Sequence, residues 1–337
     1  MLLNHYRRAI HIMENLNNIH FENEQEKIQF LNNQRRIENF EIVNISTLKG
    51  YNRINYYYNL IRNLIKPQNI IVKNFKETSL VKVDNDTKKA WEKMLDIEPS
   101  EAKKVFVAYH SKFVFDSMMK ALDHKGINFK NVMHLSTCMN FIQDPLTIFA
   151  NEFVEADFEI QSIKHFNHNR AVLTMKTTLF DIFGNKSSEQ LDDVFVKNLS
   201  KDDLKTIDAK NTSYERKEVF TNKYVSTISE DNASYTKTIY LDRNFGKTYG
   251  NVSGDLNPLH TSQMFAKMAG FKEPFVQGAF WVHFMLHQIS KQHKMSHLNV
   301  YMVKPALLGQ SFKLYIKDGL FEIKNESQKV VCRGDFS

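Results

Sequence analysis

The stretch FVQGAFWVHFMLHQISKQH, residues 275–293, decides how the fold is read. Apolar side chains occur all round the expected helix, and one face cannot hold them all, so this helix is predicted to be buried on most sides. Short strand-like runs follow it, bounded by proline and glycine, at 297–309, 310–319, 320–327 and 329–336. A buried helix followed by successive strands predicts an antiparallel sheet wrapped on a central helix.

A similar order of elements occurs earlier in the chain. SKFVFDSMMKALDHKG, residues 111–126, predicts an apolar helix that ends at Gly126. Strand-like runs follow it at 131–146, 152–166 and 170–184. Pro145 and Pro305 end a strand run in each copy, but few residues are identical, so the repeat rests on the order of elements. Two such units lying side by side could pair into one continuous sheet.

The length of 337 residues, with 42% hydrophobic and 25% charged side chains, is typical of a globular chain of two or three domains. We predict a helical N-terminal extension at 1–74 and two α+β units at 75–212 and 213–337. Within 51–65, apolar residues recur at three- and four-residue spacing on one helix face. This stripe predicts packing onto the main body, and the alternative is a regulatory or partner-docking role.

The formal net charge of +7 favours an anionic partner, such as a nucleotide-bearing thioester, an acidic carrier protein or nucleic acid. The alternative is a solvated lysine-rich surface. Since no zinc knuckle, basic zipper or RNP motif occurs, nucleic acid is not expected.

Cysteine usage and terminal sequences bear on the compartment. Cys138 and Cys332 form neither a disulfide framework nor a metal-ligand spacing, which is typical of a reduced compartment. No apolar run approaches the roughly 18 residues that span a bilayer, so stable membrane insertion is not expected. The first residues do not resemble a signal peptide, and CRGDFS is not a peroxisomal address. We therefore expect a cytoplasmic protein.

The stretch YGNVSGDLNPLHTSQ, residues 249–263, crowds a carboxylate, an amide and an imidazole together. Asn257 is a good N-cap and Pro258 suits the first turn of a helix, so His260 is predicted to project from that turn, near Asp255. Gly254 permits a backbone conformation that a β-carbon would oppose. Such a pair could add water across a double bond or remove it. The alternative is an Asp–Asn–Pro turn with an incidental histidine.

The same stretch resembles the signature of the MaoC-like dehydratases, which include the (R)-specific enoyl-CoA hydratases, also called hydratase 2. The motif is an aromatic residue, two variable residues, an aliphatic and a small residue, then G-D-x-N-P-x-H, and YGNVSGDLNPLH fills it in order. GFKEPFVQGAFWVH, beginning at Gly270, resembles the family's entry loop to the central helix. The strong resemblance covers about 225–337, and 75–210 resembles only diffusely the first half of two-hot-dog members.

The resemblance implies an α+β double hot-dog fold: two curved antiparallel sheets, each wrapped on a central helix. It implies reversible hydration of trans-2-enoyl thioesters, or dehydration of (R)-3-hydroxyacyl thioesters, in fatty-acid metabolism. Asp255 and His260 would hold the catalytic water, with His260 as its base and Asp255 handling the C2 proton. The backbone N–H of Gly278 would stabilise the thioester oxyanion. Asn257, Gln277 and Gly254 complete the expected substrate site.

Other expectations follow from the resemblance. The substrate carrier would be coenzyme A or acyl carrier protein, no cofactor or metal is implied, and a homodimer is one open arrangement. The unit at 75–212 lacks D-x-N-P-x-H and is expected to be non-catalytic. His283 and His287 have a spacing that can bind metal, but burial as core or hydrogen-bonding residues is favoured. The alternative function is a non-catalytic acyl-thioester-binding or scaffold protein that kept the fold.

Overall fold

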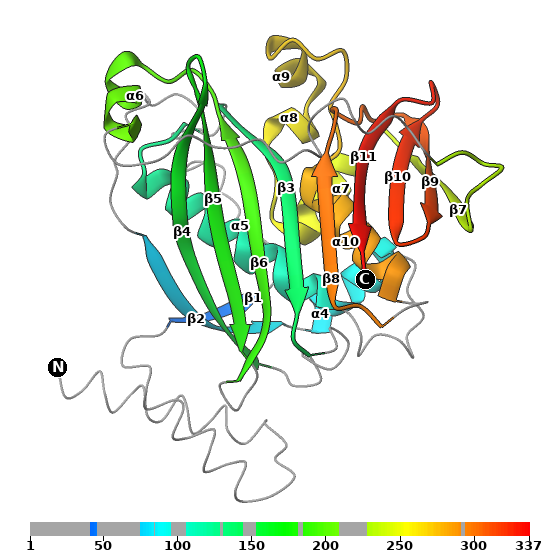
Figure 1. The fold of residues 1–337 in the computed structure, drawn as a ribbon, viewed down its shortest axis with the longest axis horizontal. Coiled ribbons are helices and arrows are strands. Elements are labelled where there is room, and N and C mark those ends of the chain that lie inside the picture. The colour runs from blue at the N-terminus through cyan, green and yellow to red at the C-terminus, as the bar shows by residue number, and fades with distance from the viewer. Residues whose placement is uncertain are drawn as a thin grey trace, which may run out of the picture.

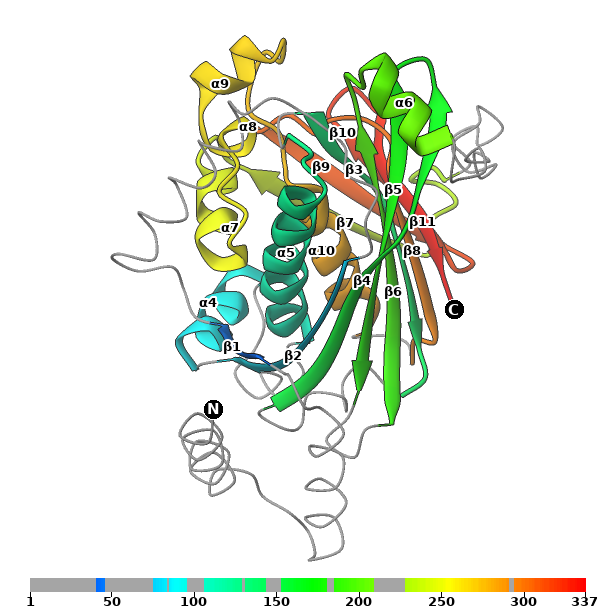
Figure 2. The ribbon, with the colours of Figure 1, turned by 90° about the vertical axis from the view of Figure 1, so that its left-hand side faces the viewer.

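The computed structural model describes residues 41–45, 75–83, 85–95, 106–128, 131–143, 153–180, 185–208, 228–290 and 294–337. Within these ranges one eleven-stranded sheet runs through the molecule, in the order β1-β2-β4-β5-β6-β3-β8-β11-β10-β9-β7. The sheet is strongly curved, and the helices α4, α5, α7 and α10 lie on its concave side (Figures 1 and 2).

The first set of strands is wrapped on helix α5 (Phe106–His124). Its strands lie in the order β2-β4-β5-β6-β3, so the first and second strands in sequence are at the two edges of the set. Helix α5 connects those two edge strands. The strands are β2 (Lys76–Val83), β3 (Val132–Phe141), β4 (Phe153–Asn167), β5 (Arg170–Phe180) and β6 (Lys186–Val196).

The second set repeats this topology around helix α10 (Gly278–Ser290). Its order, β7-β9-β10-β11-β8, again has the first and second strands at the edges, with α10 between them in sequence. The strands are β7 (Tyr235–Leu241), β8 (His297–Met302), β9 (Gln310–Lys317), β10 (Leu320–Asn325) and β11 (Val330–Phe336).

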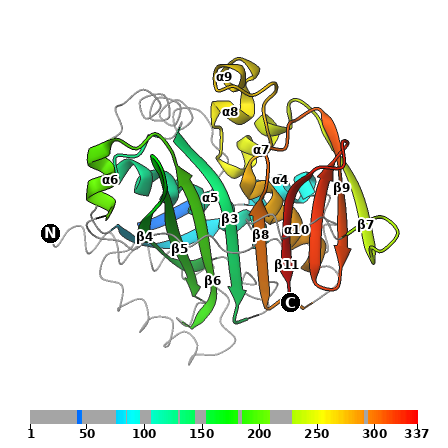
Figure 3. The same cartoon turned by 45° about the horizontal axis from the view of Figure 1, so that its top comes forward.

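The two sets join through their second strands. β3 and β8 pair antiparallel, with Thr137 opposite Val300 and Asn140 opposite His297. The seam makes one continuous sheet, and α5 and α10 contact each other beneath it (Figure 3). This arrangement is the double hot-dog fold that the sequence analysis expected.

Burial explains why α10 is central. Every residue from Phe280 to Ile289 is buried, as the apolar side chains all round this helix predicted. Trp281 packs edge-on against Phe312 of β9, with ring centroids 5.3 Å apart. The helix therefore fills the concavity of the second set of strands instead of presenting one face to solvent.

Shorter helices complete the described fold. On α4 (Asn85–Leu95), the fully buried Trp91 packs edge-on against Tyr249 and His283. Helices α7 (Phe245–Ser253), α8 (Pro258–Thr261) and α9 (Gln263–Met268) all lie in the connection from β7 to α10. Helix α6 (Lys201–Asp208) follows β6. In the part of the chain that the structure describes, no helix is long and apolar enough to cross a membrane.

Two elements differ from the sequence expectations. The strand β6 was not predicted, because its run KSSEQLDDVFV is mostly polar, yet Ser187, Ser188, Gln190, Asp192 and Asp193 are buried in the structure. Helix α7, at Phe245–Ser253, was not predicted either. Within this helix, position 250 requires glycine because a Cβ there would lie 2.5 Å from the carbonyl oxygen of Asp255.

Of the segment 1–74, the structure describes only residues 41–45. These form β1 (Glu41–Ile45), which pairs parallel with β2, where a helical extension was expected. The β-branched residues Ile42, Val43 and Ile45 favour a strand at this point. The helix face predicted at 51–65 lies outside the described residues.

Candidate active site

The connection between β7 and α10 builds the candidate site, beginning at the end of α7. Gly254 caps this helix in the left-handed conformation, with φ of 88°, and its N–H donates to the carbonyl oxygen of Gly250. Glycine adopts this conformation without the cost that a β-carbon adds, as the sequence predicted. The chain turns at this residue, and Asp255 follows it directly.

Asn257 organises the turn and starts α8. Its backbone N–H donates to Oδ1 of Asp255 at 3.3 Å, and its own Oδ1 accepts from the N–H of Leu259 at 3.1 Å. Pro258 is the first residue of the helix, where its missing N–H would have had no partner. The predicted N-cap is therefore confirmed, and it places His260 in the first turn of α8.

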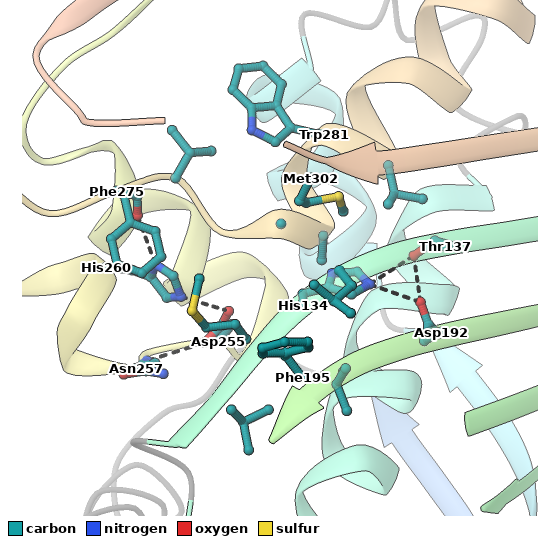
Figure 4. A pocket seen from close by; sticks show the side chains of 18 of the residues that line it. His134, Thr137, Asp192, Phe195, Asp255, Asn257, His260, Phe275, Trp281 and Met302 are labelled. Atoms are coloured by element: carbon teal, nitrogen blue, oxygen red, sulfur yellow. Dashed lines mark hydrogen bonds and ion pairs between the residues drawn. The ribbon is translucent and has the colours of Figure 1, made fainter. Parts of the chain in front are cut away.

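Asp255 and His260 face each other across a short gap (Figure 4). Nε2 of His260 lies 3.9 Å from Oδ2 of Asp255, and the two side chains are 11% and 15% exposed. This separation is too long for a direct hydrogen bond, but both atoms are within reach of one bridging water molecule. The pair can thus act on a single small molecule from two sides.

The orientation of His260 is set by the loop before α10. Nδ1 of His260 lies 2.7 Å from the carbonyl oxygen of Phe275, and a carbonyl can only accept, so the ring donates Nδ1–H. The Phe275 ring packs edge-on against the imidazole, with centroids 4.6 Å apart. In the neutral ring, Nε2 then carries the lone pair, and it is this nitrogen that faces Asp255.

The environment changes the acidity of Asp255. Burial raises the pKa of this carboxyl above its ordinary value, and it outweighs the lowering effects of His260, the Asn257 N–H and His134. A carboxyl group with a raised pKa can hold and deliver a proton near neutral pH. The site therefore pairs a proton acceptor, Nε2 of His260, with a group suited to proton donation.

Gly278, the first residue of α10, also lines the site. Gly278 starts the helix, and its N–H belongs to the first turn, where the helix itself offers no acceptor. The neighbouring Gln277 is fully buried and donates its side-chain amide to the carbonyl oxygens of Gly246 and Asp255, at 2.8 and 3.1 Å. Gln277 thereby ties the start of α10 to the loop that carries Asp255.

Asp255, His260, Phe275 and Gly278 line one cavity of about 340 Å³. Its walls come from both sets of strands and both long helices, and most of the lining is apolar. The lining residues from the first set include Val114, Met118, Met119, Leu122, Val194 and Phe195. An elongated apolar ligand could lie against this wall while its polar end reaches Asp255 and His260.

The structure separates the expected site residues into two groups. Asp255, Asn257, His260 and Gly278 all line the cavity. Gln277 and Gly254 are not among its lining residues, although both were expected to bind substrate. Gln277 instead hydrogen-bonds two backbone carbonyls, and Gly254 provides the turn, so both shape the site from behind.

The two histidines on α10 are buried, as favoured from the sequence. Nδ1 of His283 is 2.9 Å from the hydroxyl of Tyr249, and Trp91 packs against the same ring. Among the described residues, no group of three or more His, Cys, Asp or Glu side chains could hold a metal ion.

Sequence reasoning missed three polar residues in the cavity wall. His134 and Thr137 on β3 and Asp192 on β6 line the cavity and hydrogen-bond to one another (Figure 4). Polar side chains within strands were the available signal. No motif connects positions 134 and 192, however, because only the pairing of β3 with β6 brings them together.

Known proteins that resemble this chain were found by sequence and by structure. Residues 218–313 match the family model described as MaoC like domain. The sequence matches no curated protein.

Several solved structures are similar in fold. HtdX of Mycobacterium tuberculosis has a TM-score of 0.58 at 14% identity, over 78% of this chain and 99% of that one. A MaoC-like dehydratase from Phytophthora capsici has a TM-score of 0.56 at 14% identity, covering 82% and 97%.

The peroxisomal multifunctional enzyme type 2 of Drosophila melanogaster has a TM-score of 0.52 at 14% identity, over 78% of this chain. The chain spans about half of that enzyme's length, 48%. At these identities the structures show a shared fold, and the family model identifies the part that contains the Asp255–His260 loop. The chain therefore carries a MaoC-like domain, matched at residues 218–313, within a double hot-dog fold.

Proposed function

We propose that this chain is a hydro-lyase that reversibly hydrates trans-2-enoyl thioesters to (R)-3-hydroxyacyl thioesters. The acyl chain lies along the apolar wall from the first set of strands. The thioester lies at the start of α10, and the C2–C3 double bond lies over the gap between Asp255 and His260. A hydro-lyase of this kind would act in fatty-acid metabolism.

The proton transfers balance within the pair. Nε2 of His260 takes a proton from water as the hydroxyl bonds to C3, and Asp255 delivers its proton to C2. The proton that His260 took from water then passes to Asp255, so both side chains regain their starting protonation states. Because both side chains meet at one point, the hydroxyl and the proton add to the same face of the double bond.

The thioester oxygen needs stabilisation while C3 is attacked, since electron density moves onto it. The Gly278 N–H, at the positive end of the α10 dipole, is the proposed donor. The proposed steps use only the chain's own side chains and backbone.

One observation carries the proposal: Nε2 of His260 and Oδ2 of Asp255 lie 3.9 Å apart in the same cavity as the first residue of α10. The orientation of His260 by Phe275 and the raised pKa of Asp255 support the assignment of base and acid. The MaoC-like match over 218–313 supports the reaction class.

The test is hydration of crotonyl-CoA and of longer enoyl-CoAs, followed by loss of conjugated absorbance and by chiral analysis of the product. Asp255→Asn and His260→Ala should each lower kcat about 10²- to 10⁴-fold, as expected for groups that transfer protons. Asp318→Asn is the matched control, because Asp318 is exposed in a turn at φ of 48°, a conformation that asparagine also tolerates.

Two outcomes would contradict the proposal. Near-full activity in both variants would exclude this mechanism. Binding of acyl-CoA by folded wild-type protein without any hydration would favour a non-catalytic acyl-thioester-binding or scaffold protein.

The carrier is a separate question, and comparing an enoyl-CoA with the same acyl group on acyl carrier protein answers it. A homodimer and a cytoplasmic location stay predictions.

A further inference from the structure

A polar cluster from the first set of strands, in which Thr137 and Asp192 are buried and His134 is half-buried, faces the cavity opposite the Asp255–His260 pair. Nε2 of His134 lies 3.2 Å from Oδ1 of Asp192 and 3.0 Å from the hydroxyl of Thr137. Thr137 donates its own hydroxyl proton to Asp192, and the side-chain amide of Gln190 donates to the other carboxylate oxygen. The carboxylate thus holds one edge of the His134 ring in place.

A β-bulge makes the cluster. His134 and Thr137 are three residues apart, so in a regular strand their side chains would point to opposite faces of the sheet. The register of β3 against β6 shifts between His134 and Ser136, which puts both side chains beside Asp192. Ser136 instead hydrogen-bonds Asp193. Bulges of this kind re-aim side chains and are over-represented beside active sites.

The free edge of the ring faces the start of α10. A Cβ built on Gly278 would lie 2.8 Å from Nδ1 of His134 and 3.1 Å from its Cβ. The imidazole therefore occupies the space that a side chain at 278 would need. His134 also lies close enough to Asp255 to lower the pKa of that carboxyl.

The carboxylates that face the His134 ring favour a ring that donates hydrogen bonds. The carboxylates that face it are Asp192 on β6 and Asp255 in the catalytic loop, and His260, Lys197 and Lys304 also line the cavity. Burial alone would raise the pKa of Asp192, but its hydrogen bonds and the nearby His134 hold it below the ordinary value. Asp192 is thus an ionised acceptor behind the ring.

We propose that His134 is a catalytic residue from the first set of strands, and that its Nδ1–H, together with the Gly278 N–H, hydrogen-bonds the thioester oxygen of the substrate. This inference rests on the proposed function. In this arrangement Nε2–H donates to Asp192 and Nδ1–H donates to the thioester oxygen, and the Asp192 carboxylate lies behind the ring to balance charge. No proton leaves His134 during the reaction, because its part is to stabilise the negative charge that develops on that oxygen.

The positioning role of Asp192 follows from the same contacts. Asp192 touches the ring at Nε2, on the edge opposite the substrate, and acts through it. The unit at 75–212 was expected to be non-catalytic because it lacks D-x-N-P-x-H. On this proposal it supplies half of the oxyanion site instead.

The experiment compares His134→Ala, His134→Gln and wild type in steady-state hydration of crotonyl-CoA, with the affinity for butyryl-CoA and the melting temperature measured on each protein. Loss of one oxyanion donor typically costs 10²- to 10³-fold in kcat, so His134→Ala should fall by about that factor. KM, butyryl-CoA affinity and melting temperature should change little, because the charge exists only in the transition state. His134→Gln, which keeps a neutral donor, should lose less.

A double-mutant cycle separates positioning from structural support by Asp192. Asp192→Asn should lower kcat in wild type but have little further effect on kcat in the His134→Gln background. His297→Gln is the matched control for His134→Gln. His297 lies on β8, its ring hydrogen-bonds Asn140, and it is not a cavity-lining residue. A purely structural Asp192 would lower melting temperature and activity in both backgrounds.

The outcomes are distinguishable. An active wild type together with a folded His134→Gln or His134→Ala protein of near-wild-type kcat would overturn this inference and leave the proposed function standing. Parallel loss of kcat and butyryl-CoA affinity would also overturn it, since that pattern indicates general damage to the pocket. A wild type that hydrates no enoyl thioester would overturn the proposed function, and the role of His134 would fall with it.

Discussion

The two sets of strands share one topology but differ in what lies between the first strand and the central helix. In the second set this connection holds α7, α8 and α9, and it carries Asp255 and His260. In the first set, α4 lies in the corresponding connection, and its buried Trp91 packs onto the second set's Tyr249 and His283. On the proposed function, the catalytic groups therefore lie in a connection that a repeated scaffold positions.

The first set contributes by a different route. Its strands and α5 form much of the apolar cavity wall, and its polar residues reach the cavity through a bulge in β3. On these two proposals, the second unit contributes catalytic groups from a loop and the first unit contributes one from its sheet. Each of the following variants alters one side of this comparison.

Among these variants, the largest loss of kcat is expected at the start of α10. Gly278→Ala puts a methyl group 2.8 Å from Nδ1 of His134, so the ring must move and the thioester must shift from the helix N-terminus. We expect kcat to fall about 10²-fold or more, as for loss of an oxyanion donor. Steady-state kinetics and a crystal structure of the variant would measure both effects.

Gly270→Ala is the control for Gly278→Ala. Gly270 has φ of 88° with open space around it, so alanine strains the backbone there without touching the cavity. Its melting temperature should fall while kcat is kept. Equal kinetic losses in the two variants would contradict a specific role for the close contact at 278.

A second, smaller effect is expected where Gln277 ties α10 to the Asp255 loop. Gln277→Leu leaves the carbonyl oxygens of Gly246 and Asp255 without this donor, which costs about 1–3 kcal/mol of unfolding free energy for a buried polar group. We expect a moderate loss of kcat as the loop relaxes. Denaturant unfolding measures the stability change. Gln263→Leu on the exposed start of α9 should have a much smaller effect on stability, since its amide donates to the Glu273 carboxylate at an exposed site.

The cavity wall of the first set can be tested by filling it. Met118→Trp should reduce kcat/KM for long enoyl-CoAs by roughly tenfold or more and leave crotonyl-CoA nearly unaffected, since the bulk removes room for the distal chain. Met264→Trp on the exposed part of α9 is the control. If chain-length preference does not move, the acyl chain does not lie along α5.

The smallest expected effect is on the pH dependence of stability. Because the pKa of Asp255 is raised in the folded protein, folding binds its proton, and stability falls as pH rises from the ordinary value of 3.8 through the folded pKa. Asp255→Asn removes that titration, so its melting temperature should rise relative to wild type across this window. A variant that loses stability more steeply at higher pH would contradict the raised pKa.

Much of the second set was predictable from residues. The apolar α10, the N-cap at Asn257 and the left-handed Gly254 each follow from local chemistry, and the structure confirms them. Local rules worked because helix caps and glycine turns depend on neighbours in sequence.

The first set was harder to predict because its key features are not local. The polar β6 is a strand because its neighbours β3 and β5 pair with it on both sides. His134 and Asp192 are 58 residues apart, and a register shift that no motif marks brings them together. Gln277 was expected to belong to the substrate site, but its amide faces backbone carbonyls and not the cavity.

The most direct test of the Asp255–His260 assignment is the stereochemistry of hydration. Crotonyl-CoA is hydrated by the wild-type chain in D₂O, and the configurations at C3 and at the deuterated C2 of the product are determined. Since both groups lie on one side of the same gap, deuterium and hydroxyl should add to the same face of the double bond, and the proposed reaction gives the (R) configuration at C3. An (S) product, or addition to opposite faces, would contradict it.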